Sequence, residues 1–177
     1  HLQAQHLFGR RFCRAPRGLP MTRRNWKRWQ PATLRDALKG CKDYALERHH
    51  LSVERIAERM GLEDHWALYK WIANGRMPLV LVPAYEHACG IALVARWMAA
   101  TDDKLLVDMP KGRQAQPADM VELNTGFAQA LQLLTDFYQA DGKADPVATL
   151  DALRSHLEQV AYHHHNVATY ATPELEF

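Results

Sequence analysis

The chain has 177 residues, of which 47% are apolar and 24% are charged, close to the composition of ordinary globular proteins. This length suits one compact domain, or a small domain with an appended module. No apolar run approaches the roughly 20 residues of a membrane-spanning helix, so we expect no membrane partner. The three cysteines, Cys13, Cys41 and Cys89, have no metal-ligand spacing and form no even framework, so we expect a reduced, cytoplasmic location.

The formal net charge of +2 hides an asymmetry along the chain. Residues 1–20 contain four arginines and no acid, and residues 21–110 hold 14 Lys and Arg against 11 Asp and Glu. Residues 111–177 hold 4 Lys and Arg against 9 Asp and Glu. A basic front and an acidic tail indicate that any contact with a polyanion belongs to the front.

Residues 1–20 contain no methionine and no sustained apolar period, and they lack the apolar core of a signal peptide. The character of the sequence changes at Met21, which we interpret as the natural start. Residues 1–20 are then expected to be a disordered or artificially added leader, with a native basic arm as the alternative.

From Pro31 onward, apolar residues recur at three- and four-residue spacing, which predicts an all-α fold. The front domain is expected at 21–110, with helices at 31–48, 53–60, 64–72, 83–89 and 91–100. Ser52 and Asp64 are the expected N-caps, and Gly61 and Gly90 are the expected stops. Residues 79–82 fit an extended connector or the first turn of the fourth helix, and residues 104–109 fit a brief strand or an extended arm.

The polar stretch 111–118 is typical of a linker, and two amphipathic helices at 119–140 and 146–170 predict a helical hairpin within 119–177. The expected apolar stripes are Met120, Leu123, Phe127, Leu131, Leu134 and Tyr138 on the first helix, and Leu150, Leu153, Leu157, Val160, His164 and Val167 on the second. Two helices alone bury little, so the front domain or another chain must cover them. We expect self-association into a homodimer or higher oligomer, and a monomer after removal of 115–177.

The most informative stretch is 53–78, VERIAERMGLEDHWALYKWIANGRMP. Ala57 is the small residue that two closely crossing helices need, and Gly61 tolerates positive φ in a tight turn four positions later. Leu62 is expected to be buried. The second helix then turns His65, Trp66, Tyr69 and Lys70 outward and Leu68, Trp71 and Ile72 inward. A short, polar and aromatic outer face is typical of a helix that reads the major groove of DNA.

This segment resembles the helix–turn–helix of phage repressor-type regulators at Ala57, Gly61, Leu62, Leu68, Trp71, Gly75, Arg76 and Pro78. Over nearly all of 21–177 the chain is similar to prophage regulators of the YmfL type and to the broader phage regulatory CII family. The similar segments are NWKRWQ, LSVERIAERMG, LYKWIANGRMP, EHACG, and KLLVDMPKGR before a helical tail. The resemblance implies a lambda-repressor-like helix–turn–helix domain and a DNA-binding transcription regulator of phage or prophage origin in the cytoplasm of a bacterial host.

The expected DNA-binding residues form two groups. His65, Trp66, Tyr69, Lys70 and Arg76 belong to the helix–turn–helix and the turn after it. Arg23, Arg24, Lys27 and Arg28, interleaved with Trp26 and Trp29, form a basic cluster that could grip phosphates, although a solvated lead-in explains the cluster almost as well.

A protein-interaction module without DNA binding, acting as an antirepressor or assembly factor, is the competing function. The acidic tail and the pair Glu63 and Asp64 at the start of the recognition helix favour it. Consecutive residues on a helix point about 100° apart, so His163, His164 and His165 cannot all bind one ion, and no metal or cofactor is expected. The sequence holds no catalytic motif, so no enzyme activity is expected.

Overall fold

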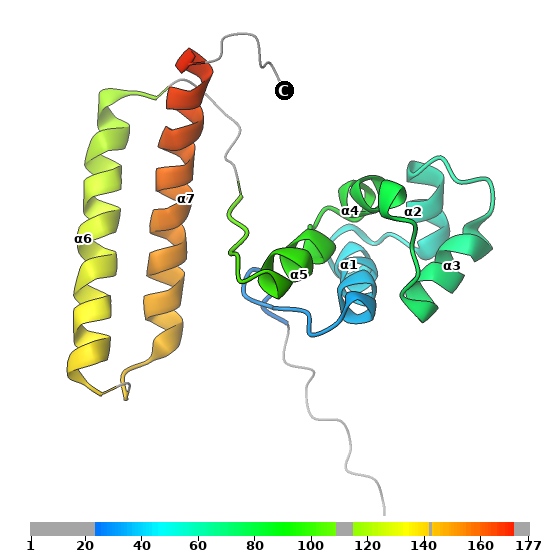
Figure 1. Ribbon diagram of the computed structural model, residues 1–177, viewed down its shortest axis with the longest axis horizontal. Helices are drawn as coiled ribbons and strands as arrows, with labels where there is room; N and C mark the ends of the chain where they lie inside the picture. The colour runs from blue at the N-terminus through cyan, green and yellow to red at the C-terminus, as the bar shows by residue number, and fades with distance from the viewer. Residues whose placement is uncertain (1–23, 109–114, 142, 172–177) are drawn as a thin grey trace, which may run out of the picture. The chain divides into compact units, whose positions relative to one another are not determined.

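The computed structural model describes residues 24–108, 115–141 and 143–171, and every regular element within these ranges is a helix (Figure 1). The all-α class is therefore confirmed for this part of the chain. The expected leader 1–20 and Arg23 lie outside it. The chain divides into two compact units, residues 1–93 and 94–177. The division falls at the first residue of helix α5 (Leu93–Thr101).

The first unit contains α1 (Leu34–His49), α2 (Val53–Arg59), α3 (His65–Asn74), the short 3₁₀ turn η1 (Leu79–Leu81) and α4 (Val82–Cys89). The expected start of the first helix at Pro31 was wrong, because Thr33 caps the helix. Its hydroxyl oxygen accepts a hydrogen bond from the backbone N–H of Asp36 at 3.1 Å. Residues 79–81 form a tight helical turn that leads directly into α4. Of the two structures expected for this stretch, the first turn of the fourth helix is therefore closer than the extended connector.

Local capping fixes the ends of the short helices, as the sequence predicts. The Ser52 hydroxyl accepts from the backbone N–H of Arg55 at 3.4 Å, and the Asp64 carboxylate accepts from the backbone N–H of Trp66 at 2.9 Å. Gly61 and Gly90 have φ values of 71° and 79°, a left-handed conformation that glycine adopts without the penalty of a Cβ. The expected N-caps and stops are confirmed.

The core of the first unit forms where α1 packs on α3 and α4 and where α2 packs on the same two helices. Leu38, Ile56 and Leu68 are fully buried there, and the Tyr85 hydroxyl donates to the carbonyl of Leu38 at 2.7 Å. This core buries one side of α3 and leaves its other side available for contacts.

The second unit contains the remainder of α5 together with α6 (Pro117–Gln139) and α7 (Pro146–Ala171). The expected start of the fifth helix at Ile91 was two residues early. α6 begins two residues before the expected start, since Pro117 suits a first helical turn and the Gln116 backbone N–H donates to the Asp119 carboxylate at 2.6 Å.

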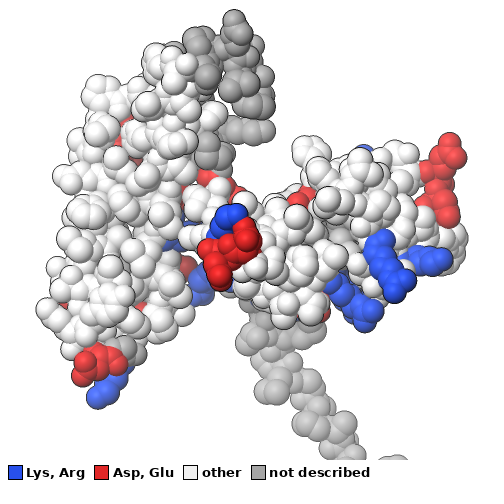
Figure 2. Space-filling view, in the orientation of Figure 1, with Lys and Arg blue, Asp and Glu red and all other residues white. Residues whose placement is uncertain are grey.

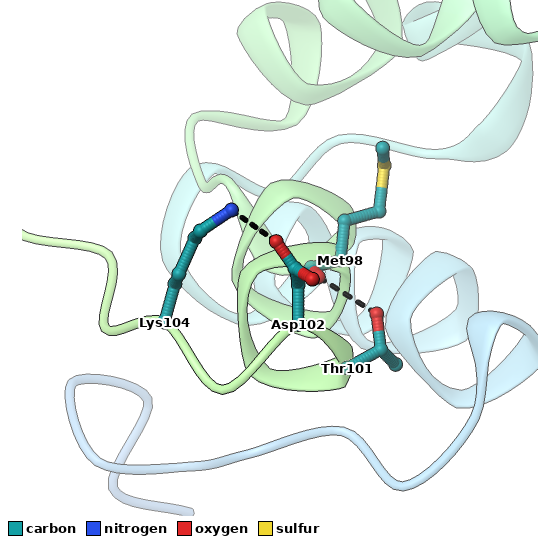
Figure 3. A network of polar contacts seen from close by, with 4 residues as sticks. All are labelled: Met98, Thr101, Asp102 and Lys104. Atoms are coloured by element: carbon teal, nitrogen blue, oxygen red, sulfur yellow. Dashed lines mark hydrogen bonds and ion pairs between the residues drawn. The ribbon is translucent and has the colours of Figure 1, made fainter.

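The last turn of α5 is closed by polar contacts (Figure 3). The Thr101 hydroxyl donates to the carbonyl of Met98 at 2.7 Å, and Lys104 pairs with Asp102. Residues 104–108 then run without regular structure, so the strand considered for this stretch does not form in its described part. The Arg154 guanidinium donates to the carbonyl of Leu106 at 3.3 Å.

α6 and α7 form the expected antiparallel hairpin, but the two apolar stripes do not face each other across it (Figure 1). We call the contact between the two helices the seam. Small and polar residues make up most of it, together with three large apolar residues of α6. Its residues are Asp119, Leu123, Gly126, Ala130, Leu133 and Phe137 on α6, and Thr149, Ala152, His156, Gln159 and His163 on α7. Most stripe residues stay exposed, including Met120 (57%), Phe127 (50%), Leu131 (49%), Leu150 (57%), Leu157 (40%) and Val160 (44%). The contact between the two helices therefore runs along a different line from the stripes, because small residues allow the helices to approach closely there.

Candidate nucleic-acid interface

α2 and α3 are joined by a turn whose backbone is tied to the end of α2. The backbone N–H of Gly61 donates to Glu58 and that of Leu62 donates to Ala57, both at 3.0 Å. Ala57 is 1% exposed, so α2 lies close against its neighbours at this point. Leu62 is only half-buried, less than the sequence predicts. The turn places the start of α3 within a few residues of the end of α2.

α3 has one buried and one exposed side. Leu68 and Ile72 anchor it in the core, with 0% and 5% of their surface exposed, as expected. Trp71, expected in the core, is half-buried. Trp66 is 69% exposed and Tyr69 is 38% exposed, and Lys70 is also exposed, whereas His65 is half-buried. The structure therefore brings the four predicted base-reading residues together on one helix, three of them open to solvent.

The three aromatic rings on this side form a cluster. The ring centroids of His65 and Trp66 lie 5.1 Å apart, those of Trp66 and Tyr69 lie 5.7 Å apart, and those of His65 and Tyr69 lie 6.3 Å apart. Such separations are typical of attractive ring contacts, which limit the rotamers that each side chain adopts. The first two turns of α3 thus present a preorganised aromatic surface rather than loose side chains.

The Tyr69 hydroxyl is held by a neighbouring helix, which the sequence does not predict. It donates to the Glu54 carboxylate on α2 at 2.6 Å. This hydrogen bond, with a smaller contribution from the Ser52 hydroxyl, lowers the pKa of Glu54 to about 2. The same hydrogen bond raises the pKa of Tyr69. At neutral pH, the ring of Tyr69 is available for contacts while its hydroxyl is already satisfied.

Cations gather beyond the C-terminal end of α3. Gly75 ends the helix with φ 74°, and a Cβ placed on it would lie 3.4 Å from the Cβ of Arg35 on α1. Arg35 therefore lies beside Gly75. The next residue in the chain is Arg76, whose backbone N–H donates to the Asn74 side chain at 2.8 Å. Figure 2 shows Lys and Arg side chains gathered over the region of α3, with acidic side chains towards the α2–α3 turn.

Arg35 is a candidate contact residue that sequence reasoning missed. It belongs to the first turn of α1, far in sequence from the helix–turn–helix, and only the packing of α1 on α3 brings it to this end. Arg35, Lys70 and Arg76 make no ion pair with any other residue in the described ranges. Their charges are available to an anion.

The segment with the basic cluster before α1 is neither a simple phosphate-binding arm nor a fully solvated lead-in, because its tryptophans pack on the protein. The Arg24 guanidinium lies over the rings of Trp26 and Trp29, 4.9 and 4.5 Å from their centroids. Trp26 is 5% exposed, and its indole N–H donates to Glu47 at 2.8 Å. Lys27 and Arg28 are exposed, and Arg23 lies outside the described residues. This segment therefore packs on α1 through its tryptophans and presents its cations around them.

The described residues hold no cluster of three or more side chains suited to bind a metal ion. Cys41 and Cys89 are buried free thiols, and burial raises the pKa of Cys89 to about 12. None of the described helices has the length and apolar character needed to cross a bilayer.

No protein-family model, curated protein or solved structure matches the chain.

Proposed function

We propose that this chain is a sequence-specific, DNA-binding transcription regulator of phage or prophage origin, which binds duplex DNA in the bacterial cytoplasm through a lambda-repressor-like helix–turn–helix formed by α2 and α3. One observation carries the proposal: α3 is anchored by buried Leu68 and Ile72 while it exposes Trp66, Tyr69 and Lys70, with exposed Arg76 and Arg35 at its end. The resemblance to prophage regulators supports the same function.

The dimensions of α3 suit the major groove. Its 10 residues span about 15 Å, and the groove is about 12 Å wide, so the exposed side can enter while the buried side stays on its own domain. Lys70 can donate to guanine O6 or N7, and His65 can donate or accept. The rings of Trp66 and Tyr69 can pack on thymine methyl groups or on sugars.

Phosphate contacts would come from two groups of cations. Arg35 and Arg76 flank its C-terminal end. The cluster of Arg23, Arg24, Lys27 and Arg28 before α1 remains a second candidate, in which Arg24 also supports the two tryptophans beneath it. Such contacts position a protein on duplex DNA and carry no base information of their own.

The alternative function, a protein-interaction module on the same fold, is favoured by the acids near α3. Glu54 stays ionised down to about pH 2, and Glu63 and Asp64 are exposed at the N-terminal end of the helix. Phosphates are repelled there, whereas a basic protein surface is attracted. The two functions therefore predict opposite responses to duplex DNA.

The test is a selection of the full-length protein on a pool of DNA duplexes with a randomised centre, followed by fluorescence anisotropy with the selected and a scrambled duplex. We expect one sequence to be enriched and to bind more tightly than the scrambled duplex. Lys70→Ala should lose roughly 1–3 kcal/mol on the selected duplex and much less on the scrambled one. Lys143→Ala, an exposed lysine in the turn between α6 and α7, is the matched control and should change neither.

No enrichment, together with equal and weak binding to both duplexes, would favour the protein-interaction module. An unchanged ratio of specific to non-specific affinity in Lys70→Ala and Tyr69→Ala would show that another element reads the bases.

A further inference from the structure

Most of the large apolar side chains that are exposed on the α6–α7 hairpin lie on one side of it. At 100° per residue, the apolar positions of each helix lie about 90° around the helix axis from its seam positions. Because the helices are antiparallel, the same rotation on both turns both stripes to the same side of the pair. We call this side the apolar face; its central residues are Phe127, Leu131, Leu150, Leu157 and Val160.

No Asp, Glu, Lys or Arg lies among the central residues of the apolar face, and exposed His164 is the polar member of the α7 stripe. In Figure 2 the side of α6 and α7 turned to the viewer is nearly all white, with charged side chains at its ends and margins. The opposite side contains Glu122 and Asp136 on α6 and Asp151 and Glu158 on α7. It also holds an open groove of about 450 Å³ beside Gly126 and Gln159. The hairpin is a layer with one apolar and one polar side.

The seam does not account for the stability of this layer. Its large apolar residues, Leu123, Leu133 and Phe137, are only half-buried, and Gly126, Ala130 and Ala152 bring little apolar area to it. The buried Nδ1 of His156 and Oε1 of Gln159 have no hydrogen-bond partner within the described residues. An unsatisfied buried polar atom costs about 1–3 kcal/mol. Two helices joined by such a seam need a second layer on the apolar face to be stable.

We propose that the apolar face binds the apolar face of a second copy of this chain, so that two hairpins form a four-helix bundle. The size of the face fits this partner. A 23-residue helix is about 35 Å long, and two helices side by side are about 20 Å wide, which gives a face of about 700 Å². A standard stable interface buries about 800 Å² on each partner.

The chemistry of the face also favours a second copy over a different protein. A face without charge offers no electrostatic feature by which a different partner would be distinguished. A two-fold axis through its centre places α6 and α7 of one copy against those of the other, and every apolar row meets an apolar row.

This inference deepens the proposed function, because a symmetric pair of chains presents two copies of α3 to two half-sites of an operator. It does not depend on that function for its test. The test measures mass in the absence of DNA, so that the two proposals can fail separately.

The experiment is sedimentation equilibrium of the full chain at micromolar concentration, with helix content measured by circular dichroism. The wild-type chain should have twice its 20.3 kDa mass. Leu131→Glu and Leu157→Glu should each raise the dissociation constant at least a hundredfold and give the single-chain mass. Both side chains are 40% exposed or more in one copy, so the charges need not disturb the fold of the hairpin itself.

The matched controls are Val121→Glu and Val147→Glu. These residues are also exposed and apolar, on α6 and α7, but lie about 100° around each helix from the apolar face. Both controls should keep the wild-type mass. A monomeric wild-type chain would overturn the proposal and leave the face to a different protein. Unchanged mass in both face variants, or equal loss in face and control variants, would overturn it as well.

Discussion

The Tyr69 hydroxyl on α3 donates a 2.6 Å hydrogen bond to the carboxylate of Glu54 on α2. The bond joins the two helices at the solvent-exposed surface, whereas Leu68 and Ile72 of the same helix are buried in the core. It therefore sets the position of the Tyr69 ring within the aromatic cluster, and it keeps a negative charge beside the proposed DNA-binding surface.

Replacing Tyr69 with Phe should raise the pKa of Glu54 from about 2 towards its ordinary value of 4.5, because the largest cause of the low value is removed. A carboxyl with a lowered pKa in the folded state stabilises the fold above its unfolded pKa, and this contribution is lost as the pH falls from 4.5 towards 2. NMR titration of the Glu54 side-chain carboxyl carbon measures the change. Ser52→Ala, which removes the smaller hydrogen bond, should shift the pKa less.

The cations at the end of α3 should control the salt dependence of DNA binding. Each phosphate contact contributes about 0.9 to the slope of log affinity against log salt concentration. Arg35→Ala and Arg76→Ala should therefore each flatten the slope by about one unit on any duplex. Arg55→Ala is the control, since Arg55 on α2 is paired with Glu58 at 3.6 Å. A slope that stays the same in both single variants would remove these two residues from the interface.

Two glycines of the first unit should resist substitution for different reasons. A Cβ on Gly40 would lie 2.8 Å from the Leu93 side chain and collide with the Trp29 ring, so Gly40→Ala should cost about 1–3 kcal/mol through overpacking. Gly61 has no atom within 4 Å of its Cβ position but has φ +71°, so Gly61→Ala should cost about 1–2 kcal/mol through backbone strain.

Asparagine separates these two causes, because it tolerates the left-handed conformation better than alanine does. Gly61→Asn should recover part of the lost stability, whereas Gly40→Asn should be worse than Gly40→Ala. Urea unfolding followed by tryptophan fluorescence reports the free energy of unfolding. Equal effects of Ala and Asn at Gly61 would contradict the strain argument.

The buried thiols should be unreactive in the folded protein. Burial raises the pKa of Cys89 to about 12 from an ordinary value of 9.0, and Cys41 is also buried. In a Cys13→Ser background, we expect no labelling of Cys41 or Cys89 by a thiol reagent at pH 8 and complete labelling in denaturant. Because the folded pKa of Cys89 is raised, its contribution to stability is present below pH 9 and is lost as the pH rises towards 12. Rapid labelling without denaturant would indicate local opening of α1 if it occurs at Cys41, and of α4 if it occurs at Cys89.

The sequence predicts those features of the fold that depend on neighbouring residues. Ser52, Asp64, Gly61 and Gly90 act within one helical turn, so their roles as caps and stops can be read directly. Thr33 acts in the same way, but the proline two residues before it suggested an earlier start. The seam was not predictable, because an apolar stripe indicates that a helix is covered without indicating by which element.

The candidate site was predictable to a similar extent. The exposed side of α3 follows from helical periodicity and from the buried Leu68. The bond between Tyr69 and Glu54, the position of Arg35 and the stacking of Arg24 on two tryptophans depend on how separate helices pack, and no local pattern encodes them.

Because the contact between α6 and α7 contains many small and polar residues, the thermal stability of the hairpin should depend on protein concentration. If the large apolar side chains are covered only when two copies meet, folding of the second unit and assembly are a single equilibrium, and the unfolded chain competes with the dimer. The midpoint of thermal unfolding of residues 94–177 should then rise with total protein concentration, while that of the first unit stays constant. Calorimetry of the full chain over a wide concentration range measures both transitions, and a second-unit midpoint independent of concentration would show that the hairpin is stable alone.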